Sequence, residues 1–86
     1  MPEISRFYGI IIRMFYNDHN PPHFHVIYQD SESLIDIKTL EVLEGNVSKR
    51  AKSLAIEWAT EHREELMANW QKAMDRKPLD KIEPLD

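Results

Sequence analysis

Residues 23–39, HFHVIYQDSESLIDIKT, decide the fold of the front half of the chain. They contain two runs in which apolar and polar side chains alternate, His23–Gln29 and Leu34–Thr39. Because successive residues of a β-strand point to opposite faces, this alternation predicts two strands. The stretch between the runs, Asp30–Ser33, consists of residues that favour turns. The two runs are therefore predicted to pair as a β-hairpin.

The position of the turn decides which side chains of the two strands meet. With Asp30-Ser31 as the turn pair, Asp36 lies directly opposite His25. With Ser31-Glu32 as the turn pair, Lys38 takes that place and Asp36 becomes the diagonal neighbour of His25. Both registers place a charged residue within reach of His25.

The segments on either side of the hairpin extend the β-rich half. Phe7–Tyr16 is dense in isoleucine and aromatic residues on both faces, which predicts a central strand covered on both sides. Asn17–Pro22 contains Asn, Asp and two prolines, so it is predicted to be a loop. Glu41–Glu44 is predicted to add a short edge strand, closed by Gly45-Asn46.

The C-terminal half has a helical pattern. Ser48 is a good N-cap, and apolar residues follow at spacings of three and four. Nothing breaks the pattern before Pro78, so one long helix is predicted to end near Asp75. The tail, Lys77–Asp86, is predicted to be an extended arm that packs back along the surface.

A helix of that length exceeds the size of the domain. It spans roughly 40 Å at ~1.5 Å per residue, whereas a compact chain of this size has a radius of gyration near ~12 Å. The helix is therefore expected to overhang the sheet, which makes Trp70 and Met74 candidates for a partner interface. The alternative for Trp70 is that the tail covers it.

Together these elements predict one α+β domain, residues 1–86. It consists of an antiparallel sheet of three to four strands packed against one long C-terminal helix, with an extended C-terminal tail. The absence of cysteine excludes disulfides, thiolate zinc sites and a cysteine nucleophile. No apolar run approaches the ~20 residues needed to cross a bilayer, so we expect a cytoplasmic protein with no membrane partner.

A histidine cluster precedes and opens the hairpin. His23 and His25 are two residues apart on a strand and leave the same face. His19 lies across a Pro-Pro pair from them, and Asp18 precedes it. These four residues are candidate ligands for a divalent transition metal such as zinc. Asp36 is the candidate to orient a ligand ring from outside the metal shell.

Two other interpretations of the histidines stay open. The rings can hydrogen-bond to backbone groups and to Asp36, which would hold the loop against the sheet. Alternatively, a histidine oriented by Asp18 or Asp36 can act as a general base without a metal.

The start of the predicted helix is basic. Lys49, Arg50 and Lys52 lie in its first turn, where the helix dipole is positive, and this is a candidate anion-binding site. The alternative is a solvated surface. The formal net charge of −4 argues against a general polyanion binder, so nucleic acid is a weakly supported partner.

The chain also resembles a known family. The resemblance covers nearly the whole length, with its most specific part at residues 21–25. The motifs are Asn17-Asp18-His19, Pro21-Pro22-His23-Phe24-His25, Ile35-Asp36-Ile37, Glu41-Val42-Leu43-Glu44-Gly45, Arg50-Ala51, Glu57-Trp58, His62-Arg63-Glu64-Glu65-Leu66, Asn69-Trp70 and Lys81-Ile82-Glu83-Pro84-Leu85. In this order they resemble the small bacterial family catalogued as domain of unknown function 4160 (DUF4160).

The resemblance implies a single α+β domain from a bacterium or mobile element. Members are often encoded beside a protein of the uncharacterised family DUF2442, in an arrangement like a toxin–antitoxin pair, and some are labelled transcriptional regulators. No settled catalytic residues come with the family.

Three functions follow as hypotheses. We favour an interaction or regulatory component of a two-gene, toxin–antitoxin-like module over an enzyme. Its partner would be the DUF2442-like product of the neighbouring gene, or a second copy in a homodimer. The first alternative is a metal-assisted hydrolase centred on the histidine cluster, with RNA as a candidate substrate and Lys49 and Arg50 near the metal. The second is a nucleic-acid-binding transcriptional regulator.

Overall fold

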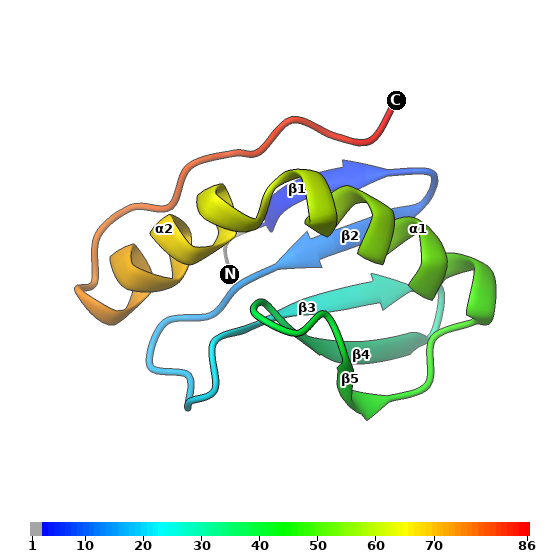
Figure 1. The fold of residues 1–86 in the computed structure, drawn as a ribbon, viewed down its shortest axis with the longest axis horizontal. Coiled ribbons are helices and arrows are strands. Elements are labelled where there is room, and N and C mark those ends of the chain that lie inside the picture. The colour runs from blue at the N-terminus through cyan, green and yellow to red at the C-terminus, as the bar shows by residue number, and fades with distance from the viewer. Residues whose placement is uncertain (1–2) are drawn as a thin grey trace.

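The computed structural model describes residues 3–86, which form an α+β fold with a five-stranded antiparallel sheet and two helices. The strands follow the sheet in chain order, β1-β2-β3-β4-β5, so each strand pairs with its neighbours in sequence (Figure 1). The strands are β1 (Glu3–Phe7), β2 (Ile10–Arg13), β3 (His23–Tyr28), β4 (Ser31–Asp36) and β5 (Val42–Gly45). The predicted class is confirmed, but the sheet has more strands than predicted.

The extra strand comes from a turn inside the predicted central strand. Phe7 pairs with Ile10 across Tyr8 and Gly9, which both have positive φ, 50° and 78°. Positive φ at both central residues is the requirement of a two-residue type I′ hairpin, whose twist matches that of the flanking strands. The continuous strand over Phe7–Tyr16 was therefore a wrong prediction, and Gly9 is the residue that signals the turn.

The β3–β4 hairpin has a register that neither predicted turn would give. Tyr28 pairs with Ser31, which leaves Gln29 and Asp30 as the turn. Gln29 has a φ of 54°. As a result, His25 lies opposite Leu34 instead of a charged residue.

Asp36 accordingly does not orient His25. It pairs with His23 at the start of β3, and its carboxylate accepts hydrogen bonds from the backbone N–H groups of Lys38 (2.7 Å) and Thr39 (3.0 Å). Its side chain therefore caps the turn after β4, as Asp side chains commonly do. The predicted role of Asp36 beside the histidine site was wrong.

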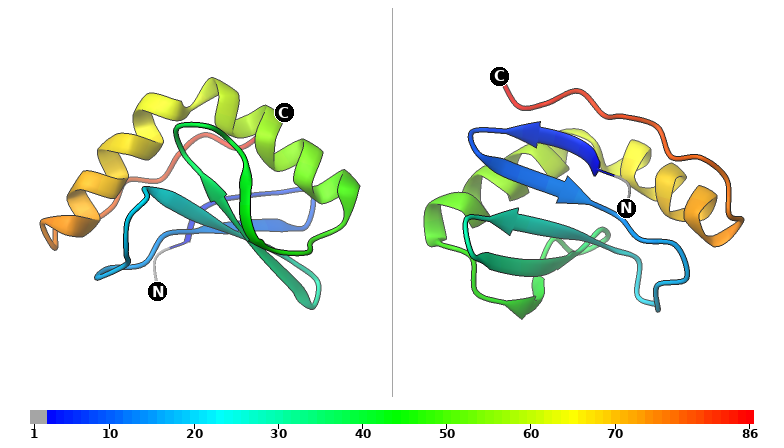
Figure 2. Two further views of the ribbon diagram at one scale, coloured as in Figure 1. Left: turned by 60° about the horizontal axis from the view of Figure 1, so that its bottom comes forward. Right: turned by 180° about the vertical axis from the view of Figure 1, so that it is seen from behind.

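The single long helix is divided into α1 (Lys49–Glu61) and α2 (Arg63–Met74), with His62 between them. Ser48 caps α1 as predicted, because its Oγ accepts from the backbone N–H of Ala51 at 3.2 Å. At the break, Thr60 Oγ1 donates to the Ile56 carbonyl at 2.7 Å, a contact type that bends helices. The bend lets both halves follow the twisted sheet, and the longest dimension of the molecule is only 33 Å (Figure 2).

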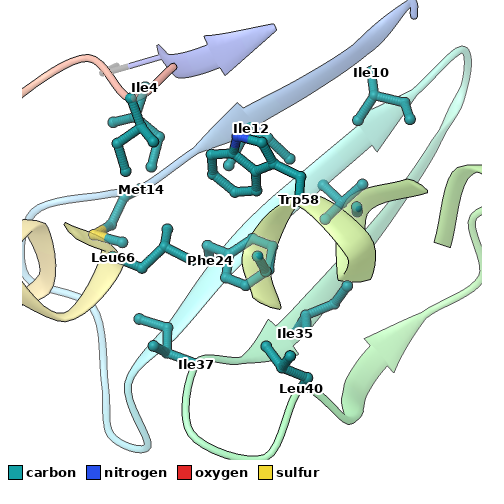
Figure 3. Close-up of a cluster of buried hydrophobic side chains, with 14 of the residues drawn as sticks. Ile4, Ile10, Ile12, Met14, Phe24, Ile35, Ile37, Leu40, Trp58 and Leu66 are labelled. Carbon is teal, nitrogen blue, oxygen red and sulfur yellow. The ribbon is translucent and has the colours of Figure 1, made fainter. Parts of the chain in front are cut away.

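The core lies between the sheet and the helices, which cover only one face of the sheet (Figure 2). Trp58 of α1 lies at its centre, fully buried between Phe7 and Phe24, with ring centroids 5.5 and 6.0 Å away (Figure 3). Trp70 of α2 is only 4% exposed and belongs to the same cluster. The expectation that Trp70 overhangs the sheet as a free partner anchor was therefore wrong, whereas Met74 is 37% exposed.

The tail is extended, as predicted, and returns beside α2 and the β1 edge of the sheet (Figure 1). The backbone N–H of Ile82 donates to the Ile4 carbonyl of β1 at 2.8 Å, and the Ile82 side chain is buried in the core cluster. No helix among the described residues is long and apolar enough to span a membrane.

Candidate metal site

Asp18, His23 and His25 meet where the β2–β3 loop joins β3. The two histidines are alternate residues of β3, so their side chains leave the same face of the strand. Asp18 reaches them from the loop. One oxygen or nitrogen of each side chain lies within 4.8 Å of the others, and all three residue types are metal ligands.

The contacts converge on one carboxylate oxygen. Oδ2 of Asp18 lies 2.9 Å from Nε2 of His23 and 3.0 Å from Nε2 of His25. The Nε2 atom of His23 is buried and is not aligned for a hydrogen bond, despite the short distance. Oδ1 of Asp18 accepts from the backbone N–H of His19 at 3.1 Å, which fixes the carboxylate.

The other ring nitrogens are also held by oxygen atoms. Nδ1 of His23 lies 2.8 Å from the carbonyl oxygen of Pro21. Nδ1 of His25 lies 2.8 Å from Oε2 of Glu32. Glu32 pairs with Ile27 on the neighbouring strand, so it is the diagonal neighbour of His25. Contacts of this kind fix the ring orientation of metal-binding histidines in known sites.

Every ring nitrogen of the two histidines therefore faces an oxygen that only accepts hydrogen bonds. Carbonyl oxygens and ionised carboxylates have no proton to donate, and a neutral imidazole has a single N–H. If Nδ1 of each ring donates to its oxygen, each Nε2 carries a lone pair and lies within 3.0 Å of Oδ2 of Asp18. Each Nε2 therefore needs a positive partner between it and Asp18. That partner is either a second proton on each histidine or a cation among the three side chains.

Aromatic rings enclose the inner part of the site. The ring of His23, which is 4% exposed, lies between those of His25 and Trp70, with centroids 5.3 and 5.2 Å away. Phe15 contacts the His25 ring edge-on at 4.4 Å. Asp18 is the most accessible of the three groups, with 21% of its side chain exposed, against 5% for His23 and 12% for His25. The site therefore opens to solvent on the side of the loop.

The pKa of Asp18 is lowered by this environment. Burial acts to raise it, but the hydrogen bond from His25, the backbone N–H of His19 and the charges of His23 and His25 outweigh that effect. A low carboxyl pKa keeps Asp18 ionised, which is the form that binds a metal or an imidazolium.

The structure brings together three of the four predicted metal ligands. His19 is exposed, and it contacts Asp18 through its backbone, so its ring is outside the group. Lys49, Arg50 and Lys52 are exposed at the start of α1, at the opposite end of the sheet from the loop that carries Asp18 (Figures 1 and 2). They therefore do not flank the site, which a phosphate clamp beside the metal would require.

Glu32 was missed by the sequence reasoning, because it was assigned to the turn. Its position follows only once the turn is placed at Gln29-Asp30. Trp70 was singled out, but for a different role. Its contact with His23 depends on the path of α2, which the sequence pattern does not specify.

Comparison with known proteins identifies the family. The family model described as "Domain of unknown function (DUF4160)" matches residues 9–71, which include every residue of the candidate site. The chain belongs to this family. No curated protein and no solved structure matches it.

Proposed function

We propose that this protein binds a divalent transition metal, with zinc as the first choice, through Asp18, His23 and His25. The observation that supports the proposal is that both Nε2 atoms lie within 3.0 Å of one carboxylate oxygen, while both Nδ1 atoms lie 2.8 Å from oxygen acceptors. Neutral imidazole is a common metal ligand. A single cation satisfies both Nε2 lone pairs and the carboxylate without protonated histidines.

The observed spacing is close to what a zinc ion needs. Zinc bonds of ~2.0–2.1 Å in a tetrahedron place two ligand atoms roughly 3.3 Å apart. The Nε2–Oδ2 distances are 2.9 and 3.0 Å, so each of these two pairs is a few tenths of an ångström from that spacing. The three ligand atoms lie within 4.8 Å of one another. Asp18 is on a loop, so its side chain can move toward that spacing.

The proposed chemistry is metal-assisted hydrolysis. Three protein ligands leave one tetrahedral position for water, as in catalytic zinc sites, and a bound metal makes such a water a better nucleophile. The solvent-accessible side of Asp18 is where a substrate approaches. With Lys49, Arg50 and Lys52 at the other end of the sheet, the geometry favours an uncharged substrate over RNA.

Metal analysis of protein purified without a nickel column tests the proposal. After incubation with zinc and desalting, we expect about one equivalent in the wild type and in His19→Ala, and a strong loss in His25→Ala. His19→Ala is the matched control, because it removes a neighbouring imidazole that is outside the group. Less than about a tenth of an equivalent in folded wild type would reject the site.

A second proposal is the interaction role in a two-gene module that the family resemblance implies. The supporting observation is the sheet face that the helices leave uncovered (Figure 2). Ile11, Ile27 and Leu34 alternate with core residues of their strands, so they lie on that face, and they are partly exposed. Co-expression with the neighbouring gene's product and size-exclusion chromatography test it. We expect a single shared peak, and two separate peaks would contradict the proposal.

A further inference from the structure

One row of side chains crosses the open face of the sheet, which is the face that the helices leave uncovered (Figure 2). Arg6 of β1 pairs with Ile11 of β2. Ile11 in turn pairs with Ile27 of β3, which pairs with Glu32 of β4. Paired residues point to the same face, and each of the four has a buried neighbour in its strand that points to the core. The row therefore reads positive, apolar, apolar, negative across the sheet.

The two charged ends of this row are accessible to a partner. The side chain of Arg6 is 61% exposed and that of Glu32 is 49% exposed. Arg6 contacts Glu3 within the chain, and Glu32 contacts His25, each at 2.8 Å. A guanidinium has five N–H donors and a carboxylate has two acceptor oxygens, so both groups can form further contacts. The two isoleucines between them are partly exposed.

A row with this order of charges is complementary to itself. A two-fold axis parallel to the strands, between β2 and β3, places two open faces against each other and reverses the row of the second copy. Arg6 of each copy then lies opposite Glu32 of the other, and the isoleucines meet at the axis. A two-fold axis along the row would instead place Arg6 on Arg6 and Glu32 on Glu32, which like-charge repulsion disfavours. The first arrangement keeps the strands of the two sheets aligned to within about 30°, as in other face-to-face sheet packings.

We propose that the open face binds a second copy of this chain, in a symmetric dimer with two Arg6–Glu32 ion pairs around a centre of Ile11 and Ile27. This inference rests on the interaction role proposed above for the same face, and it commits that face to one occupant. The apolar centre is small, with Leu34 as the next apolar residue on the face. Small interfaces of this kind associate weakly, so the dissociation constant is expected in the micromolar range.

Two charge-reversed variants of the full chain test this pairing by sedimentation equilibrium, from micromolar to millimolar concentration. Arg6→Glu and Glu32→Arg each place like charges opposite each other in the dimer, so each variant alone should associate at least about tenfold more weakly than the wild type. In an equimolar mixture of the two variants, both pairs have opposite charges again, and association should return. Lys52→Glu is the control for Arg6→Glu, because it makes the same change in net charge on α1, away from the open face.

The measurement on the wild type does not depend on the folding of a variant. A wild type that stays monomeric at millimolar concentration would overturn the proposal. A mixture of folded variants that stays monomeric would also overturn it, as would single variants that associate as tightly as the wild type. Co-expression with the neighbouring gene's product separates this inference from the interaction role. A wild type that is monomeric alone but shares a peak with that product would overturn the dimer and leave the interaction role standing.

Discussion

Glu32 and His25 are joined across two strands, with Oε2 of the carboxylate 2.8 Å from Nδ1 of the ring. The same ring presents Nε2 to Asp18 at 3.0 Å. Glu32 therefore holds the imidazole from behind while its other nitrogen faces the candidate metal position. A carboxylate placed in this way fixes the tautomer and increases the basicity of a metal-binding histidine.

Replacing Glu32 should weaken metal binding without abolishing it. Glu32→Gln keeps the size of the side chain but removes its charge, so we expect zinc affinity to fall by about tenfold or more. Glu44→Gln is the control, because it removes an exposed carboxylate on β5. Zinc titrations with a competing chelator measure both constants. Equal affinities in the two variants would show that Glu32 has no effect on the metal position.

Asp18 should make the stability of the metal-free protein depend on pH. Its folded-state pKa is lowered, so ionised Asp18 stabilises the fold above the ordinary aspartate value of about 3.9. That contribution is lost as the pH falls through the lower folded-state value. Urea unfolding of wild type and Asp18→Asn from pH 6 downward should show a difference that shrinks in acid. A difference that grows in acid would contradict the prediction, because it would mean that folding raises the pKa of Asp18.

Gly45 lies so close to the backbone of β4 that no larger residue fits at this position. A Cβ at this position would lie 2.0 Å from the Glu32 carbonyl oxygen, and its φ is +95°. Gly45→Ala should therefore lower the free energy of unfolding by about 3 kcal/mol or more. At Gly9 the same change meets nothing closer than 3.6 Å, so only the cost of positive φ remains, about 1–2 kcal/mol. Chemical denaturation of both variants measures the two losses in free energy of unfolding. The loss should be larger for Gly45→Ala than for Gly9→Ala, and equal losses would contradict the prediction.

Ser33 and Ser31 should respond differently to removal of the hydroxyl. Ser33 is 1% exposed, and its Oγ accepts from the backbone N–H of Val47 at 3.0 Å. Ser33→Ala leaves that buried N–H without a partner, at a cost of about 1–3 kcal/mol. Ser31→Ala, at a partly exposed position next to the turn, should change stability by less than about 0.5 kcal/mol. Equal unfolding midpoints would show that water replaces the Ser33 hydroxyl.

Local patterns were sufficient for several parts of the fold. The alternation at residues 23–28 predicts β3 and places His23 and His25 on one face. Ser48 and the prolines predict the helix start and the extended tail. In each case the relevant signal lies within a few residues of the feature.

The features that local sequence patterns did not predict depend on contacts between residues far apart in the chain or on an unusual backbone conformation. Ser33 has the composition of a turn residue, but its hydroxyl serves Val47, fourteen residues away, and this keeps it inside a strand. His62 interrupts the helix without proline or glycine, because both halves pack on a twisted sheet. The role of Glu32 depended on a turn in which Gln29 adopts positive φ, which its residue type does not predict.

β1 and the C-terminal tail, which both fall outside the family match, lie against each other. The match covers residues 9–71, whereas β1 precedes it and the tail that bonds to Ile4 follows it. A fragment trimmed to the matched range would leave β2, with its Ile10-Ile11-Ile12 sequence, as a bare sheet edge, and such edges promote aggregation. It would also strip the Trp58 indole of its acceptor. Expression boundaries for this protein are therefore best set by the β1–tail contact, with both β1 and the tail kept in the cloned fragment.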